Sequence, residues 1–240
     1  MRTLIRLADL IVEADYRYEY LNSQLADYKI SGDYCPDISV CVTEEDILAE
    51  RGKDCVMTFP DAYLESLAFY RKFASCAASM GCILFHGSAL SVDGEGYLFG
   101  APSGTGKSTH ARLYRELFGD RVVMVNDDKP FLRKKDDQFV IFGTPWDGKH
   151  HLSNNISVPL RGICFLKQGS ENTIRKINVQ EAMSLAFNQI YRPEAVDDMR
   201  AVLALTQALI LNIPMYELTC TISYDAVRLS YETMKGAYLQ

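Results

Sequence analysis

The alternation of apolar and polar residues divides the first third of the chain into short strands and helices. Leu4–Val12 is largely apolar and Asp37–Thr43 alternates between apolar and polar residues, which predicts two strands. Glu44–Arg51 has an acidic start and is followed by a glycine, a pattern typical of a short helix. In Asp61–Met80, apolar residues recur every three or four positions and predict a longer helix. We therefore expect an N-terminal α+β region that is rich in strands.

From Cys82 onward, apolar runs typical of strands are separated by polar loops. Cys82–Val92 and Tyr97–Gly100 are two such runs, joined by a turn that contains glycine. A helix is predicted from Lys107 to about Phe118, and the apolar run Arg121–Val125 is typical of a strand buried on both faces of a sheet. The remaining predicted elements are the hairpin 131–133 and 138–143, the strands 162–166 and 215–220, and the helices 179–190, 195–212 and 223–238.

These elements predict an α/β protein with two regions. Residues 1–80 form the N-terminal region, and residues 81–240 form a core with a helical C-terminal tail. We expect the helix 61–80 to pack across the sheet of the core, so that the boundary between the regions is not sharp. A chain of 240 residues is long enough to bury a core of this kind.

A loop of small residues lies between the strand that ends at Gly100 and the helix that begins at Lys107. Its glycines allow the backbone to turn successive N–H groups toward a polyphosphate. The ammonium group of Lys107 suits the β- and γ-phosphates, the hydroxyl of Ser108 suits Mg²⁺, and the helix N-terminus adds a positive end. The usual first glycine of such a phosphate loop is replaced by alanine. The predicted nucleotide-binding residues are Ala101, Pro102, Ser103, Gly104, Thr105, Gly106, Lys107, Ser108 and Thr109.

Two adjacent carboxylates follow the buried strand that ends at Val125. Asp127 and Asp128 lie at the carboxyl end of a strand, where the functional groups of α/β proteins gather. One of them can bind Mg²⁺, directly or through water, while the other accepts the proton of a hydroxyl group. Ser108 and Asp128 are the candidate metal ligands, but the sequence leaves open which aspartate is the base. The other interpretation is that the pair begins an ordinary loop.

Composition and charge argue against several classes of protein. The formal net charge is −6 and no basic cluster stands out, so we expect no nucleic-acid partner. No apolar stretch is long enough for a transmembrane helix and no signal peptide is recognisable, so we expect a cytoplasmic protein that does not contact a membrane. The seven cysteines form no C-x-x-C pair, which favours reduced, buried thiols.

Three segments together resemble the core of the bacterial HPr kinase/phosphorylase family. They are His86-Gly87, Leu98–Ser108 and Val125–Asp128, and Leu160–Ile163 is similar to the Arg-Gly signature of that family. The family shares a superfamily with ATP-dependent phosphoenolpyruvate carboxykinase. The resemblance covers about residues 82–168 and is strongest at the glycine-rich loop and the aspartate pair.

The resemblance implies a phosphate-loop fold with a mixed sheet, and transfer of the γ-phosphoryl group of ATP to a hydroxyl group with the help of Mg²⁺. It implies that His86 approaches the metal or the phosphate and that Arg161 stabilises the transferring phosphoryl group. Pro159 stands where the family has an acidic residue, which argues against the reverse, phosphorylase activity. The predicted catalytic residues are His86, Lys107, Asp127, Asp128 and Arg161.

The chain is similar to HPr-kinase-like proteins of modified-peptide pathways, some of which phosphorylate a peptide serine. We therefore expect an ATP- and Mg²⁺-dependent kinase whose acceptor is a serine of a peptide or protein. A nucleotide-gated module that binds a peptide or another partner without turnover, and a kinase that acts on a small metabolite, are the alternatives. A homo-oligomer is also possible. The N-terminal residues and the helical tail do not resemble those of HPr kinase.

Two further segments can contribute to acceptor binding. The loop Gly143–His151 contains the only tryptophan, Trp146, together with Lys149 and two histidines. These side chains can meet a phosphate or an acidic acceptor, or the loop can simply bury its tryptophan. The tyrosines at positions 16, 18, 20 and 28 can likewise line a groove or pack against a small sheet.

Overall fold

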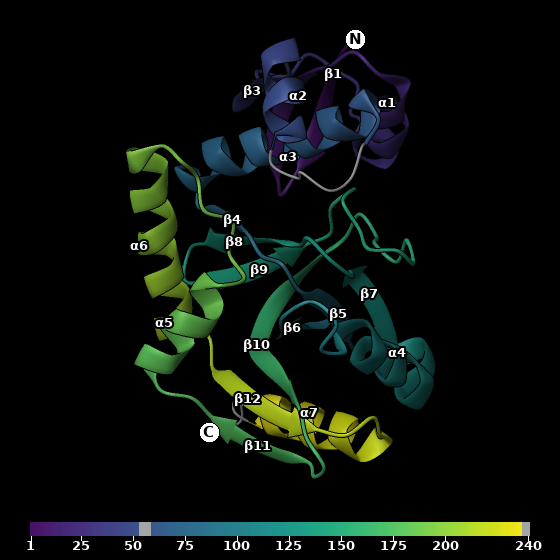
Figure 1. Cartoon of the computed structure of the whole chain (residues 1–240), viewed down its shortest axis with the longest axis vertical. Coiled ribbons are helices and arrows are strands. Elements are labelled where there is room, and N and C mark those ends of the chain that lie inside the picture. The colour runs from purple at the N-terminus through teal and green to yellow at the C-terminus, as the bar shows by residue number, and fades with distance from the viewer. Residues whose placement is uncertain (53–58, 237–240) are drawn as a thin grey trace.

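The computed structural model describes residues 1–52 and 59–236, and it has the mixed α/β architecture that the sequence predicts (Figure 1). A small N-terminal sheet and its helices lie at one end of a larger, curled sheet, which carries further helices. Within the described ranges, none of the helices combines the length and the apolar composition needed to cross a membrane.

The N-terminal sheet contains three strands. β1 (Arg2–Leu7) and β2 (Leu10–Asp15) form an antiparallel hairpin, and β3 (Ile38–Cys41) runs parallel to β2. The single strand predicted over residues 4–12 is therefore wrong. Ala8 and Asp9 have φ values of 52° and 59°, and two successive residues with positive φ close a tight hairpin turn.

Helices cover this small sheet and connect it to the core. They are α1 (Glu19–Gln24), the 3₁₀ turn η1 (Ala26–Tyr28), α2 (Glu44–Arg51) and α3 (Asp61–Ala78). α2 and α3 lie where the sequence predicts them. α2 begins with a capping box in which Thr43 and Asp46 satisfy each other's backbone N–H groups. The short α1 and η1 were not predicted.

The large sheet contains nine strands in the order β4-β8-β9-β10-β6-β5-β7, with β12 beside β10 and β11 beside β12. Their bounds are β4 (Cys82–Leu84), β5 (Ser88–Val92), β6 (Glu95–Gly100), β7 (Val122–Asn126), β8 (Phe131–Lys135), β9 (Gln138–Phe142), β10 (Ser157–Gln168), β11 (Thr173–Lys176) and β12 (Met215–Cys220). β10 pairs antiparallel with β9 at its start and runs parallel to β6 and β12 further along. The sheet is therefore mixed, and it curls about β10 (Figure 1).

Helices pack on both faces of the part of the sheet around β6. Tyr97 and Phe99 of β6 belong to the apolar cluster that contains α4 (Lys107–Phe118) and α7 (Tyr224–Gly236). Leu98, which lies between them, belongs to the cluster that contains α5 (Val179–Phe187) and α6 (Val196–Asn212). Successive side chains of a strand point to opposite faces, so this alternation buries β6 on both sides. The turn η2 (Gly119–Arg121) leads from α4 into β7.

The N-terminal region and the core share one hydrophobic cluster. Phe69 and Phe73 of α3 are fully buried in it, together with Phe131 and Trp146 of the core. The Phe73 and Phe131 rings meet edge to face with centroids 5.0 Å apart, and Phe69 stacks on Trp146 at 6.0 Å. Packing is therefore continuous where the sequence placed the boundary between the two regions.

Candidate functional site

Three segments of the chain meet at one edge of the large sheet. β5 lies between β6 and β7 and is antiparallel to both, so its start lies beside the ends of β6 and β7. The residues before β5 are His86 and Gly87, the glycine-rich loop follows β6, and the two aspartates follow β7. The Gly87 N–H donates to the Asp128 carbonyl at 2.9 Å. The fold thus brings together three of the sequence segments that carried the predicted site.

The glycine-rich loop, residues 101–106, has the backbone that its sequence predicts. Gly104 and Gly106 have φ values of +79° and +115°, in a region that L-residues rarely adopt. Gly106 is the N-cap of α4, so the unpaired N–H groups of the first turn of this helix lie at the loop. A helix N-terminus with such a loop is suited to bind an anion.

Lys107 contacts the glycine-rich loop, and a hollow lies beside it. The Lys107 ammonium group donates to the Ala101 carbonyl at 2.7 Å, across the base of the loop. Burial lowers the pKa of Lys107, and the negative charge of Asp128 opposes this effect. A hollow of about 560 Å³ opens beside the loop, a size common for small-molecule sites. It is lined by Gly104, Thr105, Gly106, Thr109, His110, Leu113, Leu166, Gln168, Gly169, Cys220, Thr221 and Ile222.

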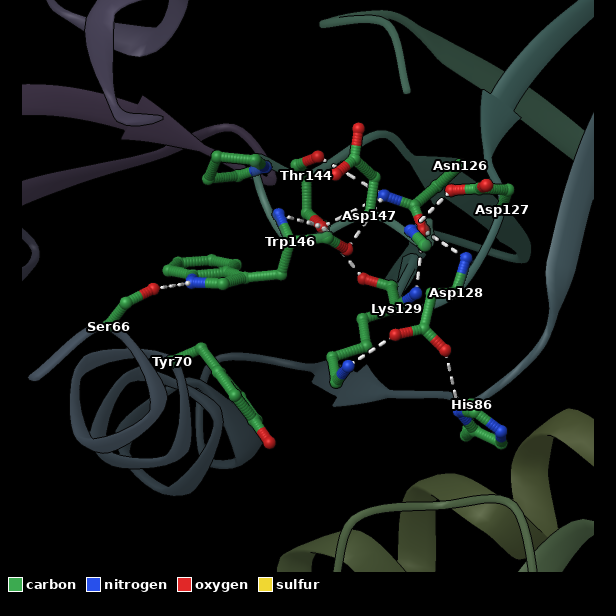
Figure 2. Close-up of polar contacts among 12 residues, drawn as sticks. Ser66, Tyr70, His86, Asn126, Asp127, Asp128, Lys129, Thr144, Trp146 and Asp147 are labelled. Atoms are coloured by element: carbon green, nitrogen blue, oxygen red, sulfur yellow. Dashed lines mark hydrogen bonds and ion pairs between the residues drawn. The ribbon is translucent and has the colours of Figure 1, made fainter. Parts of the chain in front are cut away.

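Asp128 is held in an ionised state by its neighbours. One of its carboxylate oxygens lies 3.0 Å from His86 Nδ1, and the other pairs with the ammonium group of Lys129 (Figure 2). Burial alone would raise the pKa of Asp128, but the hydrogen bond from His86 and the charge of Lys129 outweigh it and lower the pKa to about 2.

Asp127 has the opposite environment, although it is the next residue. Only 7% of it is exposed, and its Oδ1 accepts a hydrogen bond of 2.6 Å from the Gly148 N–H. Burial raises the pKa of Asp127; the Gly148 N–H opposes this shift, and the charges of Asp147 and Asp128 add to it. Asp127 also lines a hollow of about 400 Å³ together with Ser108 and Thr109. Neighbouring carboxylates with opposite pKa shifts are suited to different tasks.

Asn126 holds the turn that contains Asp128 and Lys129. It is fully buried, and its Oδ1 accepts hydrogen bonds from the backbone N–H groups of Asp128 and Lys129 at 2.8 and 2.6 Å. Its Nδ2 donates to the carbonyl groups of Thr144 and Trp146 at 3.1 and 3.2 Å (Figure 2). Asn126 therefore ties the aspartate turn to the loop 143–151. No role is predicted for Asn126 from the sequence, although a polar residue at the end of an apolar strand is a usable signal.

A family model described as SynChlorMet cassette protein ScmC matches residues 67–225, more than half of the chain. The chain belongs to the ScmC family. The matched range contains His86, the glycine-rich loop and both aspartates, and it excludes most of the N-terminal region. No curated protein matches the sequence.

Solved structures similar to this ScmC-family chain include the HPr(Ser) kinase/phosphatase from Coxiella burnetii. The two chains are 14% identical, the similarity covers 65% of this chain and 95% of the other, and the TM-score is 0.37.

One predicted site residue is placed differently from what the sequence suggested. Ser108 lines a hollow with Asp127, and its grouping with Asp128 as a metal ligand stays a prediction. Arg161, predicted to stabilise the phosphoryl group, lies on β10 and pairs with Glu95, at the start of β6. The glycine-rich loop follows the other end of β6, about 16 Å away at the usual rise of a strand. The structure does not bring Arg161 to the other predicted residues.

The oxygen ligands at the edge fit a Mg²⁺ ion that binds with a nucleotide. Within the described residues, no group of three or more His, Cys, Asp or Glu side chains could hold a metal ion. Mg²⁺ bound to phosphates needs only one or two protein ligands, because phosphate oxygens and waters complete its octahedron. The Ser108 hydroxyl and the Asp127 carboxylate, in one hollow, are of the type that this ion prefers.

Proposed function

We propose that this chain is an ATP- and Mg²⁺-dependent kinase that transfers the γ-phosphoryl group to a hydroxyl group, namely that of a serine in a peptide or protein. The observation that carries the proposal is the meeting of the glycine-rich loop, Lys107, His86 and the aspartate pair at one edge of the sheet. Phosphoryl transfer asks little covalent chemistry of a protein, so positioning and charge stabilisation supply most of the rate.

We assign the two aspartates by their neighbours. Asp127 shares a hollow with Ser108, so these two residues would hold Mg²⁺, which neutralises charge on the phosphates. Asp128 faces His86 and Lys129 and would orient the acceptor hydroxyl and accept its proton. The acceptor oxygen then forms a bond to the γ-phosphorus while the bond from that phosphorus to the oxygen of the departing ADP breaks. Lys107 and the N–H groups of the loop would stabilise the negative charge.

The proposal is tested by transfer from γ-labelled ATP, with Mg²⁺, into a size-fractionated extract of the source cell. Lys107→Ala and Asp128→Asn should each lower the incorporation of label into peptide or protein at least about a hundredfold. Lys134→Ala, at the exposed end of β8, and Asp137→Asn, in the turn that follows it, change the same residue types and should have no effect. Label in the small-molecule fraction would favour a metabolite kinase. Binding of ATP without any transfer would favour a nucleotide-gated binding module.

The assignment of the aspartates has a separate test. Asp127→Asn should raise the Mg²⁺ concentration needed for half-maximal transfer, because it removes the carboxylate beside Ser108. Asp128→Asn should lower kcat even when Mg²⁺ saturates the enzyme. The reverse pattern would exchange the two roles while leaving the kinase proposal intact.

A further inference from the structure

A cavity of about 790 Å³ lies between the N-terminal region and the core. α1, η1 and α3 supply one wall, and the segment 145–155 supplies the other. Its volume is in the range of ligand-binding sites, roughly 300–1,000 Å³. It is separate from the hollow beside the glycine-rich loop, with which it shares no lining residue.

Hydrogen bonds between distant parts of the chain hold the walls together. The Trp146 indole N–H donates to the Ser66 hydroxyl at 3.0 Å, and that hydroxyl donates to the Gln24 side-chain carbonyl at 2.6 Å. The Gln24 amide in turn donates to the Pro145 carbonyl at 2.9 Å. This closed set of bonds joins α1, α3 and the loop, so the cavity is formed before any ligand enters. A preformed site spends less free energy on ordering when it binds.

The cavity reaches both aspartates through its lining residues. Lys129 lines it and pairs with Asp128, and Gly148 lines it and donates its N–H to Asp127. Along the segment that follows, Lys149, His151 and Ser153 line the cavity, whereas His150 and Leu152 line the hollow beside Ser108. This segment is therefore a partition between the cavity and the Ser108–Asp127 hollow.

The wall formed by α1 and η1 suits a ligand with both apolar and cationic groups, whereas Lys149 and His151 lie on the opposite wall. Aromatic side chains from both walls line the cavity: Tyr20, Tyr28, Tyr63, Tyr70 and Trp146. Glu19 and Asp27 lie on the wall of α1 and η1. The Glu19 carboxylate accepts a hydrogen bond of 2.6 Å from the Asn22 side-chain amide, and neither acid has an ion-pair partner among the described residues. Burial, followed by the charges of Asp27 and Asp147, raises the pKa of Tyr28.

We propose that this cavity binds the acceptor peptide and favours a segment in which an arginine or lysine lies a few residues from the acceptor hydroxyl. The cation would pair with Glu19 and Asp27 and lie against the tyrosine rings, which attract cations through their faces. The hydroxyl would lie at the other end of the cavity, where Lys129 meets Asp128. The proposal rests on the proposed function for the fate of the hydroxyl, although binding can be tested without turnover.

Trp146 makes the binding test selective, because it is the only tryptophan and it lines the cavity. The probes are short synthetic peptides with one serine, in which an arginine or a glutamate is moved stepwise through the neighbouring positions. Trp146 fluorescence is followed as each peptide is added to the full chain. We expect saturable binding of the best arginine peptide, at least about fivefold tighter than that of its glutamate counterpart.

Substitutions of Glu19 and Asp27 test whether these two acids cause the preference for arginine peptides. The Glu19→Gln, Asp27→Asn double variant should lose the preference for arginine and still bind the uncharged parent peptide like the wild type. Asp33→Asn, an exposed acid of the same region that does not line the cavity, should keep the preference. Equal affinity for arginine and glutamate peptides, no saturable binding of any peptide, or a preference that survives the double variant would overturn the proposal.

Transfer from ATP is measured on the same peptides, so that the two proposals can fail separately. If the arginine peptide binds as expected but never accepts label, the cavity proposal stands and the kinase proposal fails. If peptides accept label with the same KM in the wild type and the double variant, the kinase proposal stands and the cavity proposal fails.

Discussion

The two sides of the candidate site are built in different ways. The proposed nucleotide side is centred on one continuous stretch, in which the glycine-rich loop runs directly from β6 into α4. The proposed acceptor side is the cavity, whose walls are joined by hydrogen bonds between residues that are 42, 80 and 121 positions apart in the sequence. Both sides meet at Asp127 and Asp128, which lie between the loop and the cavity.

Because the two sides are built differently, we expect them to respond differently to amino-acid substitutions. The proposed nucleotide side depends on backbone conformation, because the N–H groups of the loop and two glycines with positive φ would make the binding surface. The acceptor side depends on packing between the N-terminal region and the core, because neither wall alone encloses the cavity. A substitution that loosens this packing should damage the acceptor side first.

The largest effect is expected for Phe69→Ala. Phe69 is fully buried and stacks on Trp146 across the junction of the two regions. Removing a buried phenylalanine ring costs about 3–5 kcal/mol, and here the gap opens beside the wall of the cavity. We expect this loss in the free energy of unfolding, measured by denaturant titration, together with a red shift of Trp146 fluorescence in the folded protein.

Phe139→Ala is the matched control for that variant. Phe139 is equally buried, but it belongs to the cluster of the large sheet that includes α5 and α6. It should lower stability by a similar amount and leave the emission of Trp146 unchanged. If both variants shifted the emission of Trp146 alike, the shift would report a general loss of stability and not a change in packing at the junction of the two regions.

Features formed by neighbouring residues could be predicted from the sequence, whereas features formed by distant segments could not. The glycine-rich loop, α4, β12 and the aspartates at the end of β7 follow from local patterns, and the structure has each element where it was expected. The functions assigned to these residues remain predictions. Local patterns succeed here because a turn, a helix start and a buried strand each depend mainly on neighbouring residues.

The features that were missed depend on pairing between distant segments. The cavity could not be predicted, because Gln24, Ser66 and Trp146 come together only in the folded chain. The placement of Arg161 was not visible either, since its register against β6 is set by the long strand β10. α1 and β11 were overlooked because the residues that form them, Glu19–Gln24 and Thr173–Lys176, include too few apolar side chains for a period to show.

A smaller effect, confined to the nucleotide side, is expected for Gly106→Ala. A Cβ at this position meets no other atom within 4 Å, so the cost is backbone strain at a φ of +115°. A left-handed backbone costs an alanine about 1–2 kcal/mol, and relief of the strain would turn the N–H groups away from the phosphates. We expect ATP to bind roughly tenfold more weakly, measured by calorimetry, while peptide binding at the cavity is unchanged.

Gly94→Ala provides the comparison for that variant. Gly94 also has a positive φ, +84°, and open space around its Cβ position, but it lies in the turn between β5 and β6, at the opposite edge of the sheet. It should cost similar stability and leave the affinity for ATP as it is. Equal losses of ATP affinity in the two variants would mean that general destabilisation, not the loop, weakens the binding.

The smallest effect is expected for Arg161→Ala. Arg161 pairs with Glu95 at the start of β6, and both side chains are partly exposed, 27% and 41%. Such pairs contribute about 0–1 kcal/mol, so the free energy of unfolding should change little. Transfer from ATP should stay within about twofold of wild type, since the guanidinium group lies far from the loop that would bind the phosphates. A hundredfold loss in a folded Arg161→Ala protein would place this arginine at the reacting phosphate and would show that the nucleotide side extends beyond one continuous stretch of chain.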